Sequence, residues 1–446
     1  MTDPNHLYQR AFKRSLDTPV ITRDYRSVNA PFGPEIAAIR WLEKNGYDLH
    51  YVAGADLARR AFADEILSRS KAYLSVGHDE YWTYPQREAL YAARENDGLH
   101  LNFWSANENY WAVRFEDDDP RTMIIYKETQ HVAKLDPALD QWTGTFRDAR
   151  PINPKGARPE NALSGTMFVA NAQRVDPIYL DGERFGAHRA WRNTSVAAGA
   201  RYYALPGVLG HEWDEIADNG WSPPSLQLLS ETTVDNVQCI KDHGATFDTG
   251  TATHNLVLFR HPNSGAWTFG AGTVQWSWAL DATHDPNDPQ RANKYDIRVE
   301  TDVRGPIRDL QQLTVNIFQD QGVLPASLDP TLHLVDAPVD DEGPTATLDA
   351  ATLEDGILRL AGGATDVGGA VASVEVSWTP GRWHFAALDR VAAEVRWTLS
   401  WGDEPWHALH GALPTDADKD LFGLRVSDDS GNVLYEVPAL WGMDEL

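Results

Sequence analysis

The sequence predicts an α/β domain built on an open parallel sheet, followed by a smaller all-β sandwich. Three observations predict this fold class. Residues 34–115 alternate between helix-like and strand-like segments, residues 329–345 are rich in proline and acidic residues, and residues 345–446 contain short alternating segments separated by Gly, Asp and Pro. The chain has 446 residues, of which 42% are hydrophobic, so two or three domains with a buried core are expected.

The first region has the strand–helix–strand spacing of a parallel sheet. Ile36, Ile39 and Leu42 recur three residues apart and Gly46 follows them, which is typical of an amphipathic helix that ends at glycine. Short apolar runs with no polar alternation indicate buried parallel strands. These patterns predict a helix over 34–46, a strand over 48–53, a helix over 56–70, a strand over 72–76, a helix over 85–96 and a strand over 99–104.

Residues 116–250 are less regular and rich in Asp, Asn, Pro and Gly, which indicates strands joined by long loops. Long loops in a compact domain are more often functional than accidental. The apolar segments here and further along predict strands over 123–126, 167–170 and 202–209, a hairpin of 255–259 with 267–269, a strand over 273–278 and a helix over 310–319.

The C-terminal region has the strand spacing of a sandwich. Residues 1–30 are polar without a sustained period, so we expect an N-terminal arm, an α/β catalytic domain over 31–330 and a sandwich over 345–446. The segments expected to be strands of this sandwich are 346–348, 357–360, 371–378, 395–401 and 424–426.

Composition excludes several classes of function. The net charge of −26 argues against nucleic acid as a partner, because phosphate binding needs a basic face. No stretch approaches the roughly 18 apolar residues of a membrane span, and no secretory signal is visible, so a cytoplasmic protein is expected. Cys239 is the one cysteine, which rules out an internal disulfide, a Cys-rich zinc site and an iron–sulfur cluster.

Four polar patches follow apolar runs. GHDEYW contains His78, Glu80 and Tyr81 directly after a predicted buried strand, where α/β folds place ligand sites, although an acidic helix cap is the simpler alternative. Asn107 lies in SANENYW after the next strand, where it would fix a substrate amide or satisfy loop backbone. The other two patches are MIIYK, with Tyr126, and GHEWD, with His211 and Glu212.

Taken together, GHDEYW, YWAVRFE, MIIYK, GHEWD and WTFGAGTVQWSWALD resemble the large (beta) subunit of N,N-dimethylformamidase and the bacterial family that shares its C-terminal region. The resemblance covers roughly residues 30–320. It implies a class I glutamine-amidotransferase-like α/β core. Cys239 lacks the sharp strand-to-helix turn of an amidotransferase nucleophile, so that chemistry is not expected. The C-terminal region similarly resembles the immunoglobulin-like domains appended to many bacterial enzymes.

The resemblance also implies a mononuclear iron site that hydrolyses a small amide. Its ligands map onto Tyr81, Tyr126 and Glu212. Phenolate and carboxylate are hard oxygen donors that suit Fe³⁺, and three ligands leave positions for water and a substrate carbonyl. His78, Glu80 and His211 are candidates for orienting a ligand or acting as general base, and the sequence does not choose among them.

Two other functions remain open from the sequence. One is a non-catalytic protein with a degenerate amidotransferase-like fold that binds a carbohydrate or peptide. The other is a role in sugar metabolism, since trehalose-utilisation-type proteins share the amidotransferase-like fold. Because dimethylformamidase works with a small subunit, either a small partner subunit or a homo-oligomer is expected.

Overall fold

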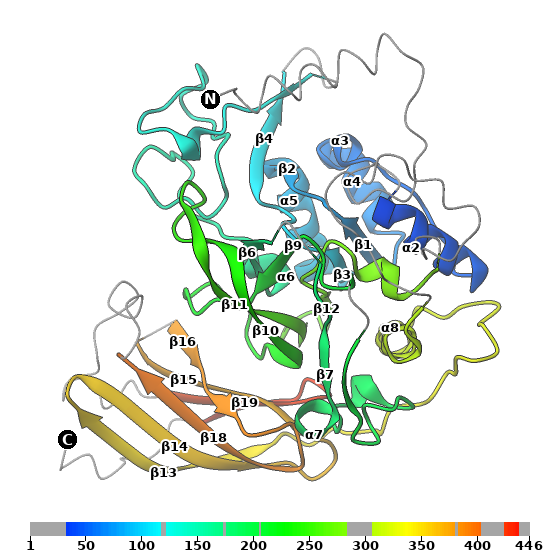
Figure 1. The fold of residues 1–446 in the computed structure, drawn as a ribbon. Helices are drawn as coiled ribbons and strands as arrows, with labels where there is room; N and C mark the ends of the chain where they lie inside the picture. The colour runs from blue at the N-terminus through cyan, green and yellow to red at the C-terminus, as the bar shows by residue number, and fades with distance from the viewer. Residues whose placement is uncertain are drawn as a thin grey trace.

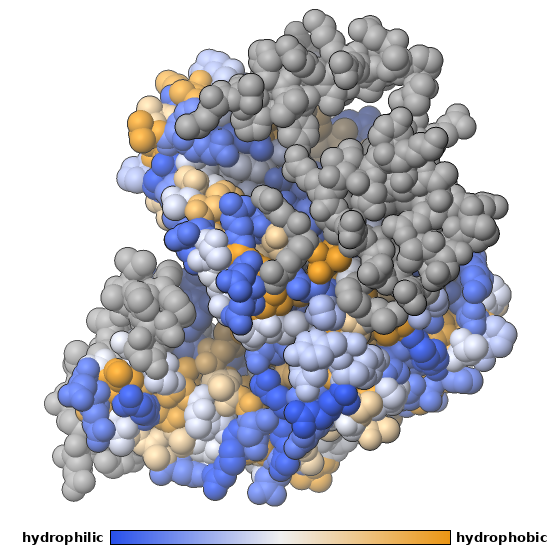
Figure 2. Space-filling view, viewed as in Figure 1, coloured by the Kyte–Doolittle hydropathy of each residue, from blue (hydrophilic) through white to orange (hydrophobic). Residues whose placement is uncertain are grey.

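The computed structural model describes residues 33–116, 122–172, 175–204, 207–282, 306–379, 382–402 and 423–436. The expected N-terminal arm, residues 1–30, lies outside the described residues. Among the helices described, none is long and apolar enough to cross a membrane. On the face seen in Figure 2 the described surface is mainly hydrophilic with scattered hydrophobic residues, in keeping with the acidic composition.

The centre of the molecule is a seven-stranded sheet with the order β1-β3-β12-β11-β10-β6-β9 (Figure 1). β3 pairs in parallel with both β1 and β12, and the remaining neighbours pair antiparallel. The strands are β1 (Ala72–Gly77), β3 (His100–Ser105), β6 (Met167–Asn171), β9 (Glu212–Glu215), β10 (Gln227–Ile240), β11 (Phe247–Arg260) and β12 (Trp267–Gly270).

The expectation of an open parallel sheet is therefore correct for only one end of the sheet. The other end is antiparallel because β10 and β11 form one long hairpin, with Ile240 opposite Phe247. Antiparallel strands can be joined by such a short turn, whereas parallel strands need a crossover connection. The fold class is α/β with a large mixed sheet.

Helices cover both faces of the parallel end. Leu101 and Phe103 of β3 pack in a cluster with residues of α3, α4 and α5, whereas Trp104 packs on the other face with residues of α2 and α8. Successive strand residues point to opposite faces, so both faces of β3 are buried. The helices are α2 (Gly33–Lys44), α3 (Gly54–Leu57), α4 (Arg60–Leu67), α5 (Tyr84–Ala92) with its π-helical continuation η1 (Ala93–Asp97), and α8 (Arg308–Asp320).

Several expected elements differ from the structure. Within the described residues, the strand expected over 202–209 ends at Tyr203, in β8 (Arg201–Tyr203), and the strand expected over 123–126 ends at Ile124. Residues 48–53 form no strand, and the helix expected over 56–70 is divided into α3 and α4. The strand expected over 273–278 is replaced by the short 3₁₀ helix η4 (Trp276–Ala279), whose four residues are all buried. A short apolar run does not by itself distinguish a buried strand from a buried helical turn, which explains this error.

The C-terminal region consists of two four-stranded antiparallel sheets around their own apolar cluster. All five segments expected to be strands there lie within strands. One sheet has the order β13 (Thr345–Glu354), β14 (Ile357–Thr365), β18 (Glu394–Trp401), β17 (Ala387–Leu388). The other has the order β16 (Arg382–Phe385), β15 (Val371–Thr379), β19 (Gly423–Asp428), β20 (Val433–Glu436).

A buried ion pair within this sandwich also makes a hydrogen bond to the central sheet region. Glu375 of β15 accepts from Arg425 Nε and Nη2 of β19 at 2.5 Å each, and its Oε2 also accepts from the backbone N–H of Ser225 at 3.0 Å. Glu375 and Arg425 are buried. The Ser225 contact therefore links the sandwich to the segment that leads into β10.

Candidate metal centre

The candidate site lies where the parallel strands β1 and β3 end. Gly77 is opposite Ser105 in the register, so the loops that follow the two strands begin side by side. Gly77 has φ of 78°, a conformation that glycine adopts without steric cost, and it turns the chain into the segment from His78 to Glu80. Asn107 follows β3 with φ of 48°, which asparagine tolerates better than most residues.

Backbone hydrogen bonds hold these two loops together. The N–H of Asn109 donates to the carbonyl of Asp79 at 2.9 Å, and the N–H of Trp111 donates to that of Glu80 at 2.9 Å. The contact continues as a parallel pairing of β2 (Tyr81–Thr83) with β4 (Trp111–Phe115), which is followed by β5 (Met123–Ile124) in the same three-stranded sheet. The loops thus fix the backbone positions of the candidate side chains.

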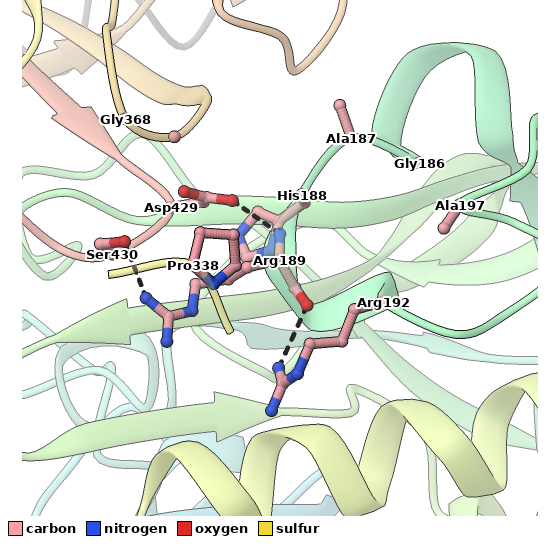
Figure 3. Close-up of a pocket in the computed structure, with 11 residues that line it drawn as sticks. Gly186, Ala187, His188, Arg189, Arg192, Ala197, Pro338, Gly368, Asp429 and Ser430 are labelled. Carbon is pink, nitrogen blue, oxygen red and sulfur yellow. Dashed lines mark hydrogen bonds between the residues drawn. The ribbon is translucent and has the colours of Figure 1, made fainter. Parts of the chain in front are cut away.

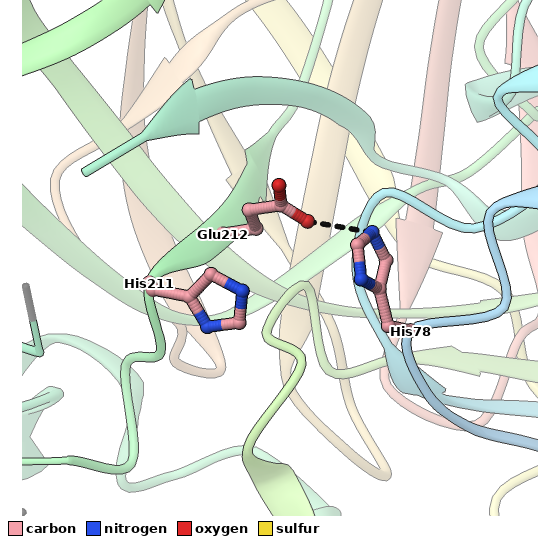
Figure 4. Close-up of side chains that lie close together, drawn as sticks. All are labelled: His78, His211 and Glu212. Atoms are coloured by element: carbon pink, nitrogen blue, oxygen red, sulfur yellow. Dashed lines mark ion pairs between the residues drawn. The ribbon is translucent and has the colours of Figure 1, made fainter. Parts of the chain in front are cut away.

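Glu212, at the start of β9, is the centre of the cluster. Its Oε2 lies 2.6 Å from His78 Nε2 and accepts a hydrogen bond from Asn107 Nδ2 at 3.1 Å. Asn107 Nδ2 is also 3.0 Å from His78 Nε2. Glu212 and His211 both project toward His78 across the gap between β9 and the loop after β1 (Figure 4).

The electrostatics make Glu212 and His78 a charged pair. Burial would raise the pKa of Glu212, but the charge and hydrogen bond of His78 outweigh it and lower that pKa to about 2. Burial likewise disfavours a charged His78, yet Glu212 and the nearby Glu80 raise its pKa to about 9. Glu212 is therefore an ionised, nearly buried carboxylate at neutral pH.

Glu80 and Tyr81 extend the cluster on the side of His78. Glu80 Oε2 lies 3.3 Å from His78 Nε2, and the Tyr81 side chain hydrogen-bonds to the Glu80 carboxylate. The pKa of Glu80 is raised, mainly by burial and also by the negative charge of Glu212. The positive charges of His78 and Lys127 offset only part of this rise. Contacts thus connect Glu212, His78, Glu80 and Tyr81 in one series.

Lys127 is a member of the site that sequence reasoning missed. Its Nζ donates to Tyr81 Oη at 3.2 Å and lies 4.7 Å from the centre of the Trp111 ring. The only signal in the sequence was its position beside Tyr126 in MIIYK. Lys127 brings a positive charge next to the phenol of Tyr81, where a cation stabilises a developing phenolate.

The described contacts do not join Tyr126 to Tyr81 or Glu212. Tyr126 is 39% exposed, and its backbone N–H donates to Thr143 Oγ1 at 3.1 Å. Tyr126 contributes to the raised pKa of Arg114, whose largest cause is the hydrogen bonding to Asp136. The assignment of Tyr126 as a metal ligand stays a prediction.

His211 forms a second potential donor set with two of the same residues. His78, His211 and Glu212 each offer one ligand atom, and these atoms all lie within 4.8 Å of one another. The rings of His78 and His211 are 6.2 Å apart, centre to centre, and nearly perpendicular. Two histidines with one carboxylate are a common ligand set for zinc and for ferrous iron.

Two buried acids lie next to Asn107, and one of them, Asp214, hydrogen-bonds to its backbone. Asp214 Oδ1 accepts from the backbone N–H of Asn107 at 3.0 Å, and its Oδ2 accepts from Thr166 Oγ1 at 3.2 Å. Burial raises the pKa of Asp214 to about 7 and that of Glu108 well above its usual range. Asp214 was also missed from the sequence, although it lies two residues after Glu212 in GHEWD.

The comparison with known families agrees with the resemblance. The model of the family described as N,N-dimethylformamidase beta subunit-like, C-terminal, matches residues 2–292. No curated protein matches the chain. The matched residues are more than half of the chain and include all the candidate residues from His78 to Glu212. The chain therefore belongs to the N,N-dimethylformamidase beta subunit-like, C-terminal family.

Proposed function

We propose that this protein is an iron-dependent amidohydrolase that cleaves a small amide, with Tyr81, Tyr126 and Glu212 as the ligands of one Fe³⁺ ion. Membership in the family relates the chain to amide hydrolysis at a coarse level. The observation that carries the proposal is the state of Glu212. It is a nearly buried, ionised carboxylate whose described hydrogen bonds all end on Oε2, so Oε1 is left to bind a cation.

The residues present fit a hard cation. Glu212 and Tyr81 offer oxygen donors, and Glu80 hydrogen-bonds to the Tyr81 phenol. Asn107 Oδ1 is a buried polar atom with no hydrogen-bond partner in the described structure, as expected beside a group that has still to be bound. When bound, iron would polarise the substrate carbonyl and lower the pKa of a coordinated water.

The protein's own residues divide into positioning and proton-transfer roles. His78 and Asn107 both contact Glu212 Oε2, so they fix the direction in which Oε1 points. Glu80 contacts His78 and Tyr81, and no described hydrogen bond joins it to Glu212. Its carboxylate would therefore be available to accept a proton from the water that attacks the amide. Glu80 and His211 are therefore the two candidates for moving a proton to the leaving amine.

A second donor set is favoured by one specific observation, the proximity of His78, His211 and Glu212. With these ligands the ion would be Zn²⁺ or Fe²⁺. His78 would have to lose its proton and give up its 2.6 Å contact with Glu212 Oε2. In the oxygen-only set His78 keeps its proton and its contact with Glu212, although Tyr81 and Tyr126 would have to lose their phenol protons. We prefer this set because it is the one that the family resemblance implies.

Two finer structural features belong to the same proposal. The mixed sheet with its helices would be an amidotransferase-like core, and the C-terminal sandwich would be immunoglobulin-like. The family description names a beta subunit, so we also propose a small partner subunit or a homo-oligomer.

The test is metal analysis of the full chain purified without chelators, combined with amine release from a panel of small amides. We expect about one iron per chain and hydrolysis of at least one amide. Protein without stoichiometric metal that binds carbohydrate or peptide would instead support the non-catalytic alternative.

A further inference from the structure

A second acidic cluster lies in the sandwich, outside the candidate metal centre. Asp340 precedes β13, Asp366 follows β14, and Asp428 ends β19. One carboxylate oxygen from each lies within 4.8 Å of the other two. Asp428 is fully buried and Asp366 is 6% exposed. Three segments far apart in the sequence therefore place three carboxylates at one point.

Two buried oxygens of this cluster have no hydrogen-bond partner in the described structure. Asp366 Oδ2 accepts from the backbone N–H of Gly369 at 2.7 Å, but its buried Oδ1 has no hydrogen-bond partner in the described structure. Asp340 Oδ2 is likewise buried and without a partner. No described Lys or Arg side chain forms an ion pair with Asp340, Asp366 or Asp428. Buried carboxylate oxygens of this kind are costly unless a cation compensates them.

The carboxylates pack closely against the backbone at Gly369, where a side chain would have no room. A Cβ on this residue would lie 2.6 Å from Asp340 Oδ2, 2.6 Å from Asp429 Oδ1 and 3.1 Å from Asp366 Oδ2. These three carboxylate oxygens would be its closest neighbours. At Gly368 a Cβ would lie 2.4 Å from Asp340 Oδ1, so glycine is required at both positions. Three carboxylate oxygens therefore converge beside Gly369.

We propose that Asp340, Asp366 and Asp428 bind one Ca²⁺ ion, with Asp429 adding negative charge at its edge. Ca²⁺ takes oxygen ligands at about 2.3–2.6 Å, so two of its ligands lie at most about 5 Å apart. The distances between the three carboxylate oxygens, each at most 4.8 Å, fall within this limit. Zn²⁺ is disfavoured because the cluster offers no nitrogen or sulfur ligand.

Surrounding contacts hold the ligands in place and leave them acceptor capacity. Asp428 accepts three hydrogen bonds, from the N–H of Ser430 and from the N–H and Nδ2 of Asn432. A carboxylate has about four acceptor sites, so one remains for the ion. Asn432 Nδ2 also donates to the carbonyl of Asp340 at 3.1 Å, which ties the segment before β13 to the β19–β20 turn.

The site would join the sandwich to the rest of the protein. Asp429 Oδ2 accepts from the backbone N–H of Arg189, in the 3₁₀ helix η3 (Arg189–Trp191), at 2.6 Å. Figure 3 shows this contact at a cavity of about 340 Å³, which Gly368, Gly369 and Asp429 line together with residues around Arg189. Ca²⁺ would therefore stabilise the junction between sandwich and core.

The experiment is calorimetric titration of the full chain with CaCl₂ after chelator treatment, paired with thermal unfolding in Ca²⁺ and in EGTA. We expect one Ca²⁺ per chain and a melting temperature higher by about 5 °C at saturating Ca²⁺. Asp366→Asn keeps an acceptor for Gly369 and should remove both effects while leaving the circular dichroism spectrum in EGTA unchanged.

Asp355→Asn is the matched control, because Asp355 is exposed at the opposite end of β14 and its φ of 53° suits asparagine. It should bind Ca²⁺ like the parent chain. Repeating the titration with Glu212→Gln excludes binding at the candidate metal centre as the source of heat. Absence of binding at millimolar Ca²⁺, or equal binding by Asp366→Asn and the parent, would overturn the proposal.

Discussion

Replacing Tyr81 with phenylalanine separates a ligand role from a structural role. The substitution removes one oxygen and keeps the aromatic ring, so packing against Trp111 and its neighbours is retained. If Tyr81 binds iron, the loss of one of three protein donors should remove most of the metal. If it does not, iron content should be unchanged.

The effect on stability is worked from the contacts of the phenol. Tyr81 Oη accepts from Lys127 Nζ at 3.2 Å, and the phenol also hydrogen-bonds to Glu80. Each such bond contributes about 1 kcal/mol, and Lys127 and Glu80 can partly satisfy each other after the change. We expect a loss of about 1 kcal/mol, which lowers the melting temperature by about 2–4 °C.

The assay measures iron per chain and melting temperature on the same preparations. Tyr84→Phe is the matched control, since Tyr84 is three residues away and its buried hydroxyl has no hydrogen-bond partner in the described structure. It should keep its iron. Parent-level iron in Tyr81→Phe, or equal loss in Tyr84→Phe, would refute the reasoning.

Three further outcomes are expected. Glu212→Gln should lose iron while remaining folded, because a neutral amide is a weak ligand, and retention of iron would contradict this. Glu375→Gln should cost about 3–5 kcal/mol in urea unfolding, since Arg425 is left buried without a charged partner; a change below about 1 kcal/mol would contradict it. His254 is buried and burial lowers its pKa from 6.5 to about 4, so the unfolded chain binds its proton more readily and stability falls as pH falls through this range. His254→Gln should therefore lose about 2 kcal/mol less than the parent between pH 7 and pH 5, and equal losses would count against this account.

Local patterns in the sequence were enough to predict the parallel end of the sheet. The apolar runs that became β1 and β3, with α5 between them, are set by burial on both faces and by the capping of α5, where Thr83 Oγ1 accepts from the N–H of Gln86. At the antiparallel end, the hairpin of 255–259 with 267–269 is confirmed by the pairing of β11 with β12, and the strand over 167–170 is confirmed as β6. β10 was not predicted because it is largely polar. Its strand state depends on pairing with β11, which is not visible in its own residues.

The candidate site shows the same division. His78, Glu80, Asn107 and Glu212 were predicted from their places after apolar runs. The structure brings His78, Glu80 and Asn107 together because the parallel strands β1 and β3 end at one edge of the sheet. Glu212 lies at the start of β9, which pairs antiparallel with β6, so its contact with His78 does not follow from that rule. Lys127 was not predicted, because its contact with Tyr81 depends on the path of the loop after β5. The roles of these residues in binding and catalysis stay predictions.

The most direct test of the proposed function is the visible absorption spectrum of the full chain, expressed with added iron and purified without chelators. Phenolate bound to Fe³⁺ gives a charge-transfer band, whereas Zn²⁺ or Fe²⁺ held by His78, His211 and Glu212 gives none of that kind. We expect about one iron per chain and a visible band that is lost in Tyr81→Phe. Iron below about a tenth of an equivalent, or bound iron without such a band, would contradict a site built on Tyr81 and Glu212.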